Sequence, residues 1–106
     1  AVRWYRLAAE NGNAAAMNNM GACYADGEGV PQDWDEAVRW WRQAAKRGNG
    51  SAMVNLGSGY ATGKGVPQDL SEAVRLYRLG AAKGVAVAMF NLGICYENGR
   101  GVSQDW

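Results

Sequence analysis

The chain repeats itself every 36 residues, and this period constrains its fold more than any other feature. Shifted by 36 positions, the sequence aligns with itself without a gap in three units, 1–36, 37–72 and 73–106. Sixteen of the 34 columns shared by all three units are identical, so the units are expected to adopt one common structure. A period in the thirties is typical of a solenoid, in which each unit is one supersecondary element stacked on the next.

Each period is predicted to hold two helices. Apolar residues between Ala52 and Tyr60 recur at helical spacing, which predicts a first helix over roughly 49–62 and counterparts over roughly 13–26 and 85–98. We call these the A helices and the second helices of each period the B helices. No segment alternates with a period of two, so the sequence predicts an all-α fold without strands.

The ends of these helices carry recognisable capping residues. Asp33 and Glu36 resemble a capping box at the start of a B helix, and Gly48 is suited to the left-handed conformation that ends it. Asn49 is a suitable N-cap for the next A helix. Val85 stands in the same column and offers no acceptor, so we expect the last A helix to start less firmly.

Glycine is enriched because it occupies repeated columns. Twelve of the 15 glycines fall in four columns, and one of these columns, containing Gly21, Gly57 and Gly93, lies inside the A helices. A glycine in a helix interior costs about 1 kcal/mol relative to alanine, so a structural reason is needed. We expect close contact with a B helix whose facing residues, Ala45 and Ala81, are also small.

The composition excludes several classes of function. The net charge is +1, which gives no electrostatic reason to bind nucleic acid, and no apolar run is long enough to span a membrane. The chain contains no histidine, the commonest general base and metal ligand. No nucleophile has an identifiable activating base, and the Gly-x-Gly loops lack the third glycine and preceding strand of a dinucleotide site. We therefore predict a soluble non-enzyme without cofactor or metal, and the compartment stays open.

Three further groups of residues have alternative interpretations. Cys23 and Cys95 share a column two units apart, so their Cα atoms should be about 20 Å apart and the thiols free. The paired arginines of the B helices, such as Arg39 and Arg42, are interpreted as a solvated outer face, with an anionic partner as the alternative. The asparagines repeated in every A helix are interpreted as bridges to a neighbouring backbone, with ligand contact as the alternative; they are Asn19, Asn55 and Asn91.

The repeated residues resemble a known family. The run Ala52-Met53-x-Asn55-Leu56-Gly57-x-x-Tyr60-x-x-Gly63-x-Gly65-Val66-x-x-Asp69 is similar to the Sel1-like repeat, a relative of the tetratricopeptide repeat. This resemblance implies a right-handed α/α superhelix of about three 36-residue helix-loop-helix repeats, open at both ends, that binds other proteins without catalysis. It also suggests a segment of a longer array, whose open ends are able to stack with further repeats or other copies.

The function expected from this resemblance is a scaffold that binds a partner peptide or helix. The A helices should line the concave side, where columns that differ between units form one stripe opposite the buried one. One alternative is a structural spacer in a larger protein; a weaker one is the cell-wall binding or hydrolase activity suggested for cysteine-rich relatives. The residues expected to face the partner are Asn18, Ala22, Asp26, Ser51, Val54, Ser58, Thr62, Val87, Phe90, Ile94, Glu97 and Asn98.

Overall fold

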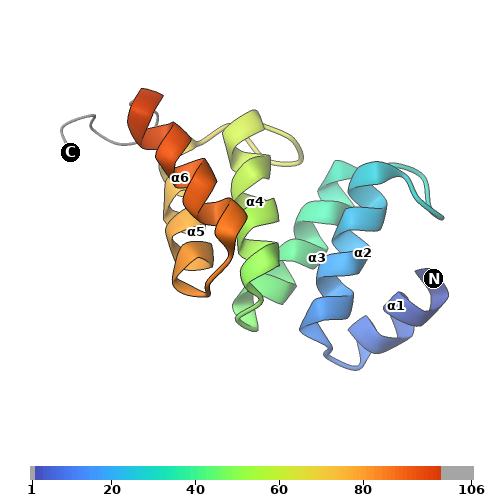
Figure 1. The fold of residues 1–106 in the computed structure, drawn as a ribbon. Helices are drawn as coiled ribbons and strands as arrows, with labels where there is room; N and C mark the ends of the chain where they lie inside the picture. Colours follow the sequence, from blue (N-terminus) through green and yellow to red (C-terminus); the bar gives the residue numbers. More distant parts are fainter. Residues whose placement is uncertain (1, 99–106) are drawn as a thin grey trace.

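The structure, a computed structural model, describes residues 2–98 and is helical without strands over that range (Figure 1). Side chains are described up to Ile94. The helices are α1 (Val2–Glu10), α2 (Ala14–Asp26), α3 (Trp34–Lys46), α4 (Gly50–Thr62), α5 (Leu70–Ala82) and α6 (Ala86–Asn98).

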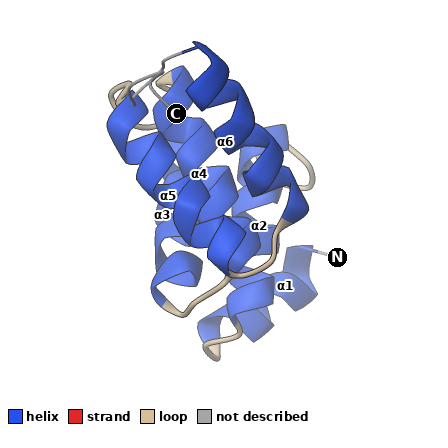
Figure 2. Ribbon diagram, turned by 60° about the vertical axis from the view of Figure 1, so that its left-hand side comes forward, coloured by secondary structure: helices blue, strands red, loops and turns tan. Residues whose placement is uncertain are grey.

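The helices form two layers along an elongated body of 47 × 25 × 17 Å. The A helices α2, α4 and α6 lie on one side, and the B helices α3 and α5 lie on the other (Figure 2). Each helix packs mainly against the helices that precede and follow it in the chain. The all-α solenoid predicted from the 36-residue period is confirmed.

The A helices begin as their capping residues predict. The side-chain oxygens of Asn13 and Asn49 each accept a hydrogen bond of 2.8 Å from the backbone N–H three residues later. Val85 cannot make such a bond. The backbone bond from Met89 N to the carbonyl of Val85 is 3.4 Å long, against 3.0 Å and 3.2 Å for the equivalent bonds to the carbonyls of Asn13 and Asn49. The weaker start expected for α6 is visible in this longer bond.

The B helices use only half of the predicted capping box. Asp33 Oδ1 accepts a 3.2 Å bond from the backbone N–H of Glu36, as expected. The reciprocal bond is absent, because Asp33 N–H donates to the carbonyl of Tyr24 at 2.9 Å and the Glu36 carboxylate accepts from Arg39 at 2.9 Å. Asp69 repeats the pattern. The carbonyl at the end of the preceding A helix therefore takes the place of the glutamate in the box.

The glycines inside the A helices allow close contact with a B helix, but the facing group differs from the prediction. A Cβ atom at Gly57 would lie 2.9 Å from Cε1 of Tyr77 and 3.3 Å from the carbonyl oxygen of Ala73, and one at Gly21 would overlap the indole of Trp41. The contact is thus made by wide aromatic rings, not by the alanines expected there. At Gly93 no described atom lies within 4 Å of such a Cβ.

These aromatic rings belong to the core that runs along the solenoid. Trp41 and Tyr77, which share a column of the repeat, are 5% and 4% exposed. Around Trp41 the core continues through Met20, Ala37 and Leu56, and a second cluster surrounds Tyr77. One contact, an aromatic ring of a B helix against a glycine of an A helix, thus occurs both between α2 and α3 and between α4 and α5.

Candidate functional site

The twelve predicted partner-facing residues differ in their exposure. Those with exposed side chains are Asp26, Ser51, Thr62, Val87, Phe90 and Ile94. Those that are half-buried are Asn18, Ala22 and Ser58, and Val54 is buried. The side chains of Glu97 and Asn98 lie outside the described residues.

Four of these residues line a pocket of about 330 Å³ between α2 and α4, which we call the A-helix pocket. Ala22 and Asp26 contribute from α2, and Ser58 and Thr62 contribute from α4. The remaining lining comes from Ala25, Trp34, Trp41, Asn55, Gly59 and Lys64. The structure thus brings together predicted residues from two successive A helices above the aromatic side chains of α3.

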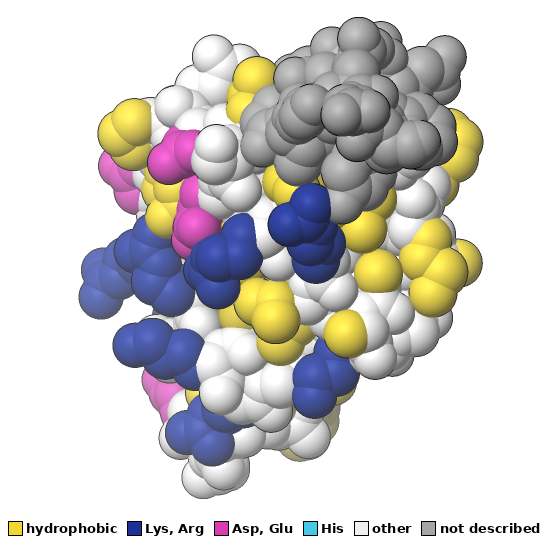
Figure 3. Space-filling view, turned by 90° about the vertical axis from the view of Figure 1, so that its left-hand side faces the viewer, with side chains coloured by type: hydrophobic (Ala, Val, Ile, Leu, Met, Phe, Trp, Pro, Cys, Tyr) yellow, Lys and Arg dark blue, Asp and Glu magenta, His cyan; other side chains and the backbone are white. Residues whose placement is uncertain are grey.

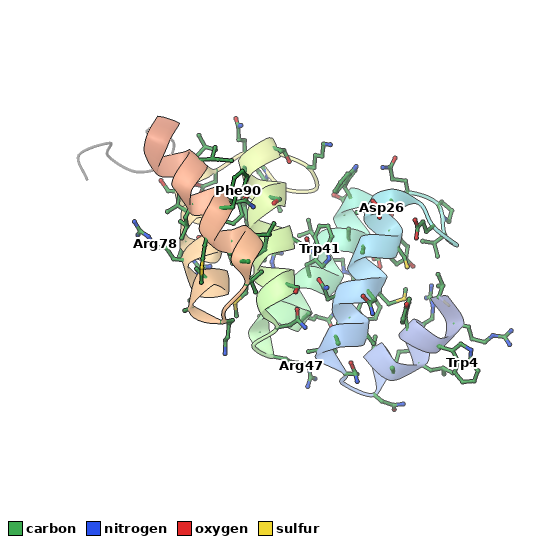
Figure 4. The ribbon with its side chains drawn as sticks, viewed as in Figure 1. Trp4, Asp26, Trp41, Arg47, Arg78 and Phe90 are labelled. Carbon is green, nitrogen blue, oxygen red and sulfur yellow. The ribbon has the colours of Figure 1, made fainter. Side chains whose placement is uncertain are left out.

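Two tryptophans of α3, Trp34 and Trp41, contribute to the lining of the A-helix pocket. Trp41 lies between α2 and α4 (Figure 4), and its Nε1–H donates a 3.2 Å bond to the carbonyl of Asn18. The ammonium of Lys64, another lining residue, lies 4.9 Å from the centre of the Trp34 ring, within the range of a cation–π interaction. Asp26, at the end of α2, adds an exposed carboxylate (Figure 4). The pocket therefore combines apolar walls with one charge of each sign.

Asn55 connects the two A helices at this pocket. Its side-chain Nδ2 donates a 2.9 Å hydrogen bond to Oδ1 of Asn18. The expected bridge from Asn55 to a neighbouring backbone group is not found, because the acceptor is the side chain of Asn18. The Oδ1 atom of Asn55 accepts no hydrogen bond from a described residue, and Asn55 is part of the pocket lining.

One known protein family matches the repeats along nearly the whole sequence. The model of the Sel1 repeat matches residues 1–13, 14–49, 50–85 and 86–105. The chain belongs to the Sel1 repeat family. The family model begins each unit at an A helix, so it divides the same 36-residue period at a different point from the units 1–36, 37–72 and 73–106.

Solved structures agree with this assignment. A protective antigen of uropathogenic Escherichia coli with an SLR fold is 42% identical to 97% of this Sel1 repeat chain, with a TM-score of 0.94. A Sel1 repeat protein from Oxalobacter formigenes is 40% identical over 95%, with a TM-score of 0.88. The chain spans 22% and 41% of the lengths of these two proteins.

A more distant structure shows the fold alone. Helicobacter pylori cysteine rich protein B is 22% identical over 86% of this chain and 68% of its own, with a TM-score of 0.80. Among curated protein sequences, none shows a significant match. Sel1 repeat solenoids are typically non-catalytic scaffolds, and the family generally mediates protein–protein interactions.

The stacking of the Sel1 repeats corrects the expected position of Val54. This residue is 4% exposed and packs in a cluster with Ala73 and Ala88 of the following helices. A Cβ at Gly80 would lie 2.8 Å from Val54 Cγ2, so the valine fills the space that this glycine leaves. The prediction that Val54 is exposed was wrong because its column faces the next repeat, not solvent.

The same column explains the exposure of Phe90. Phe90 projects from α6 (Figure 4) and is 66% exposed, whereas Val54, one repeat earlier, is covered by α5 and α6. No described residue follows α6 to cover Phe90 in the same way. Its exposure therefore follows from its place in the array and does not mark a binding site by itself.

Several residues that line the A-helix pocket are not among the predicted partner-facing residues. Trp34, Trp41 and Lys64 are the largest of them. The signal that could have found Lys64 is variation within its column, because Glu28 and Arg100 occupy the same place in the other units. The neighbouring loop residues are the same in all units, whereas the residue at this position does not keep the same charge in every unit. The common fold therefore does not depend on the side chain at this position.

The remaining chemistry of the described residues is limited. Cys23 is a free, buried thiol, and the side chain of Cys95 lies outside the described part of the chain. Burial raises the pKa of the Cys23 thiol, and the carboxylates of Glu28 and Asp26 raise it further, so the reactive thiolate is disfavoured. Within residues 2–98, no cluster of side chains suited to a metal ion occurs, and no helix is long and apolar enough to cross a membrane.

Proposed function

We propose that this Sel1 repeat chain binds a peptide segment of a partner protein in the A-helix pocket. The observation that carries the proposal is the opening between α2 and α4, where small side chains lie above buried and half-buried tryptophans. Ala22, Ser58 and Gly59 leave room, and an apolar side chain of the partner would gain contact with the aromatic surface. Burial of such a side chain is worth about 1.5–3 kcal/mol.

Polar groups around the pocket would fix the backbone of the bound segment. The free half of the Asn55 amide can bond one peptide group of the partner, since the other half is held by Asn18. Asp26 and Lys64 also line the pocket, with opposite charges. This arrangement favours a segment with an apolar side chain flanked by polar or charged residues, and it offers no site for a reaction.

The variation between repeats supports this location. The column of Ala22 contains Ser58 and Ile94, and the column of Asp26 contains Thr62. The common fold therefore accepts residues of different size and charge at these positions. Side chains that packing leaves free to vary can be adapted to a partner, whereas Val54 in the neighbouring column is buried by the next repeat.

The test selects peptides from a random phage-displayed library on the immobilised protein and measures the affinity of each for wild-type protein and two variants. Ala22→Ile fills the pocket with a residue that the same column accepts at Ile94. Ala15→Val makes the matched change at an exposed position of α2 outside the pocket, in a column that contains Val87.

We expect Ala22→Ile to weaken binding by about tenfold or more and Ala15→Val to leave it unchanged. A set of selected peptides that bind Ala22→Ile as tightly as the wild type would contradict the proposed site. If no peptide is selected at all, the spacer function becomes the better account.

A further inference from the structure

A second groove lies on the opposite layer, between the B helices α3 and α5, and we call it the B-helix groove. It encloses about 320 Å³, and Met53, Leu56 and Leu76 form its apolar floor. Met53, Leu56 and Leu76 are 7%, 5% and 3% exposed. At the rim, Leu79 is 40% exposed, so an apolar side chain stands open to solvent beside the groove.

The rim of the B-helix groove is positively charged. Arg42, Lys46 and Arg75 line it, against the single carboxylate of Glu72. Arg75 donates two hydrogen bonds of 2.7 Å to that carboxylate, and Arg42 donates a 3.1 Å bond to the hydroxyl of Tyr60. Lys46 has no ion pair with a described residue. Two of the three positive charges are therefore not neutralised within the groove.

The preceding repeat shows that the fold does not require this charge. The equivalent positions hold Arg6, Glu10, Glu36 and Arg39, which are two positive and two negative charges. Gln43 replaces the exposed Leu79 in the same comparison. The preceding repeat forms the same helices with residues whose charges sum to zero and with a polar glutamine in place of leucine. The excess of positive charge and the exposed Leu79 in the B-helix groove are therefore not needed for the packing of the repeats.

We propose that the B-helix groove binds an acidic peptide segment that presents an apolar side chain. The acidic residues would face Arg42 and Lys46, and the apolar side chain would cover Leu79 and reach the floor at Met53. On the face drawn in Figure 3, Lys and Arg side chains lie around small exposed hydrophobic areas, with fewer Asp and Glu side chains beside them. The site is separate from the A-helix pocket, so this inference does not depend on the function proposed above.

A partner protein fits this groove better than a nucleic acid does. The chain has a net charge of only +1, and the floor of the groove is apolar, whereas phosphate backbones are bound by surfaces with a large positive excess. The groove has positive side chains around an apolar floor. This arrangement is complementary to an amphipathic segment in which acidic residues flank an apolar stripe.

The experiment uses a fluorescent peptide of about twelve residues that combines Glu and Asp with two Leu residues one helical turn apart. One control peptide carries Gln and Asn in place of Glu and Asp, and the other carries Ala in place of Leu. Fluorescence anisotropy is measured with wild-type protein and with the double variant Lys46→Glu, Leu79→Gln, which copies Glu10 and Gln43 from the preceding repeat. The reverse double variant, Glu10→Lys, Gln43→Leu, leaves the B-helix groove intact.

We expect the acidic apolar peptide to bind at least about tenfold tighter than either control, and added salt to weaken it. The Lys46→Glu, Leu79→Gln variant should lose at least about tenfold in affinity while its helical circular dichroism stays that of the wild type. The reverse variant should keep full affinity. Undiminished binding to the first variant, equal binding of a control peptide, or preferential binding of an RNA oligonucleotide or an anionic vesicle would each overturn the proposal.

Discussion

Gly57 and Gly93 occupy the same column of the A helices, yet replacing them by alanine should change stability in opposite directions. In a helix interior alanine is favoured over glycine by about 1 kcal/mol, and this gain applies at both positions. The two sites differ in what the new methyl group would meet. At Gly57 it would lie 2.9 Å from Cε1 of Tyr77, and at Gly93 no described atom lies within 4 Å.

The ring of Tyr77 cannot move away cheaply. It is 4% exposed, and its hydroxyl is 3.1 Å from Oγ of Ser58. The carbonyl of Ala73, at 3.3 Å, closes the other side of the site. Overpacking of a closed core site costs about 1–3 kcal/mol, which exceeds the gain in helix propensity. We therefore expect Gly57→Ala to destabilise by about 1 kcal/mol and the larger Gly57→Val by about 2–4 kcal/mol.

The assay is thermal and urea unfolding followed by far-ultraviolet circular dichroism. For a chain of this size, 1 kcal/mol corresponds to a shift of the melting temperature of about 4–8 °C. Gly57→Ala should lower it by about that amount, and Gly93→Ala should raise it by up to about 5 °C. If Gly57→Ala stabilised the protein as much as Gly93→Ala does, the aromatic contact between the layers would not be the close contact described above.

Three further outcomes follow from the same contacts. Phe90→Ala should change the free energy of unfolding by less than about 1 kcal/mol, because the ring is 66% exposed; a loss of several kcal/mol in urea unfolding would place the ring in the core. Alkylation of Cys23 by iodoacetamide, followed by peptide mass spectrometry, should reach its maximal rate at a higher pH than alkylation of a model thiol, because burial raises the pKa of Cys23. A maximal rate reached at a lower pH than for the model thiol would refute this prediction. The hydrogen bonds from Arg75 lower the pKa of the Glu72 carboxyl, so their contribution to stability is complete above the unfolded pKa and is lost as the pH falls through the folded pKa. Glu72→Gln should therefore cost only a few tenths of a kcal/mol at pH 7, since Arg75 is 58% exposed, and nothing in acid; an equal cost at both pH values would contradict the assignment.

The sequence alone was enough to predict the elements of this fold. The 36-residue period and the caps at Asn13, Asn49 and Asp33 place the helix starts, because capping depends on local chemistry that the sequence displays directly. Gly48, with φ of 89°, ends its helix in the predicted left-handed conformation. Local rules were therefore sufficient for the side-chain caps and for the glycine that follows the helix, but not for the reciprocal bond of the capping box, because Tyr24 takes the N–H of Asp33.

Contacts between successive repeats could not be predicted in the same way. Val54 was expected to be exposed and is buried, because the rotation of one repeat on the next decides which column is covered. Asn55 was expected to reach a backbone group and instead bonds the side chain of Asn18 in another repeat. The A-helix pocket depends on the same rotation, so Trp34 and Lys64 were recognised as its lining only in three dimensions.

The indole N–H signals of the tryptophans test the central claim, that the A-helix pocket binds a partner peptide, most directly. Trp34 and Trp41 line this pocket, whereas Trp4 lies outside it on α1 and is 72% exposed. A two-dimensional ¹H–¹⁵N spectrum recorded during titration with a selected peptide should show the signals of Trp34 and Trp41 shifting to saturation while that of Trp4 stays in place. Saturation of binding with Trp34 and Trp41 unmoved would contradict the account.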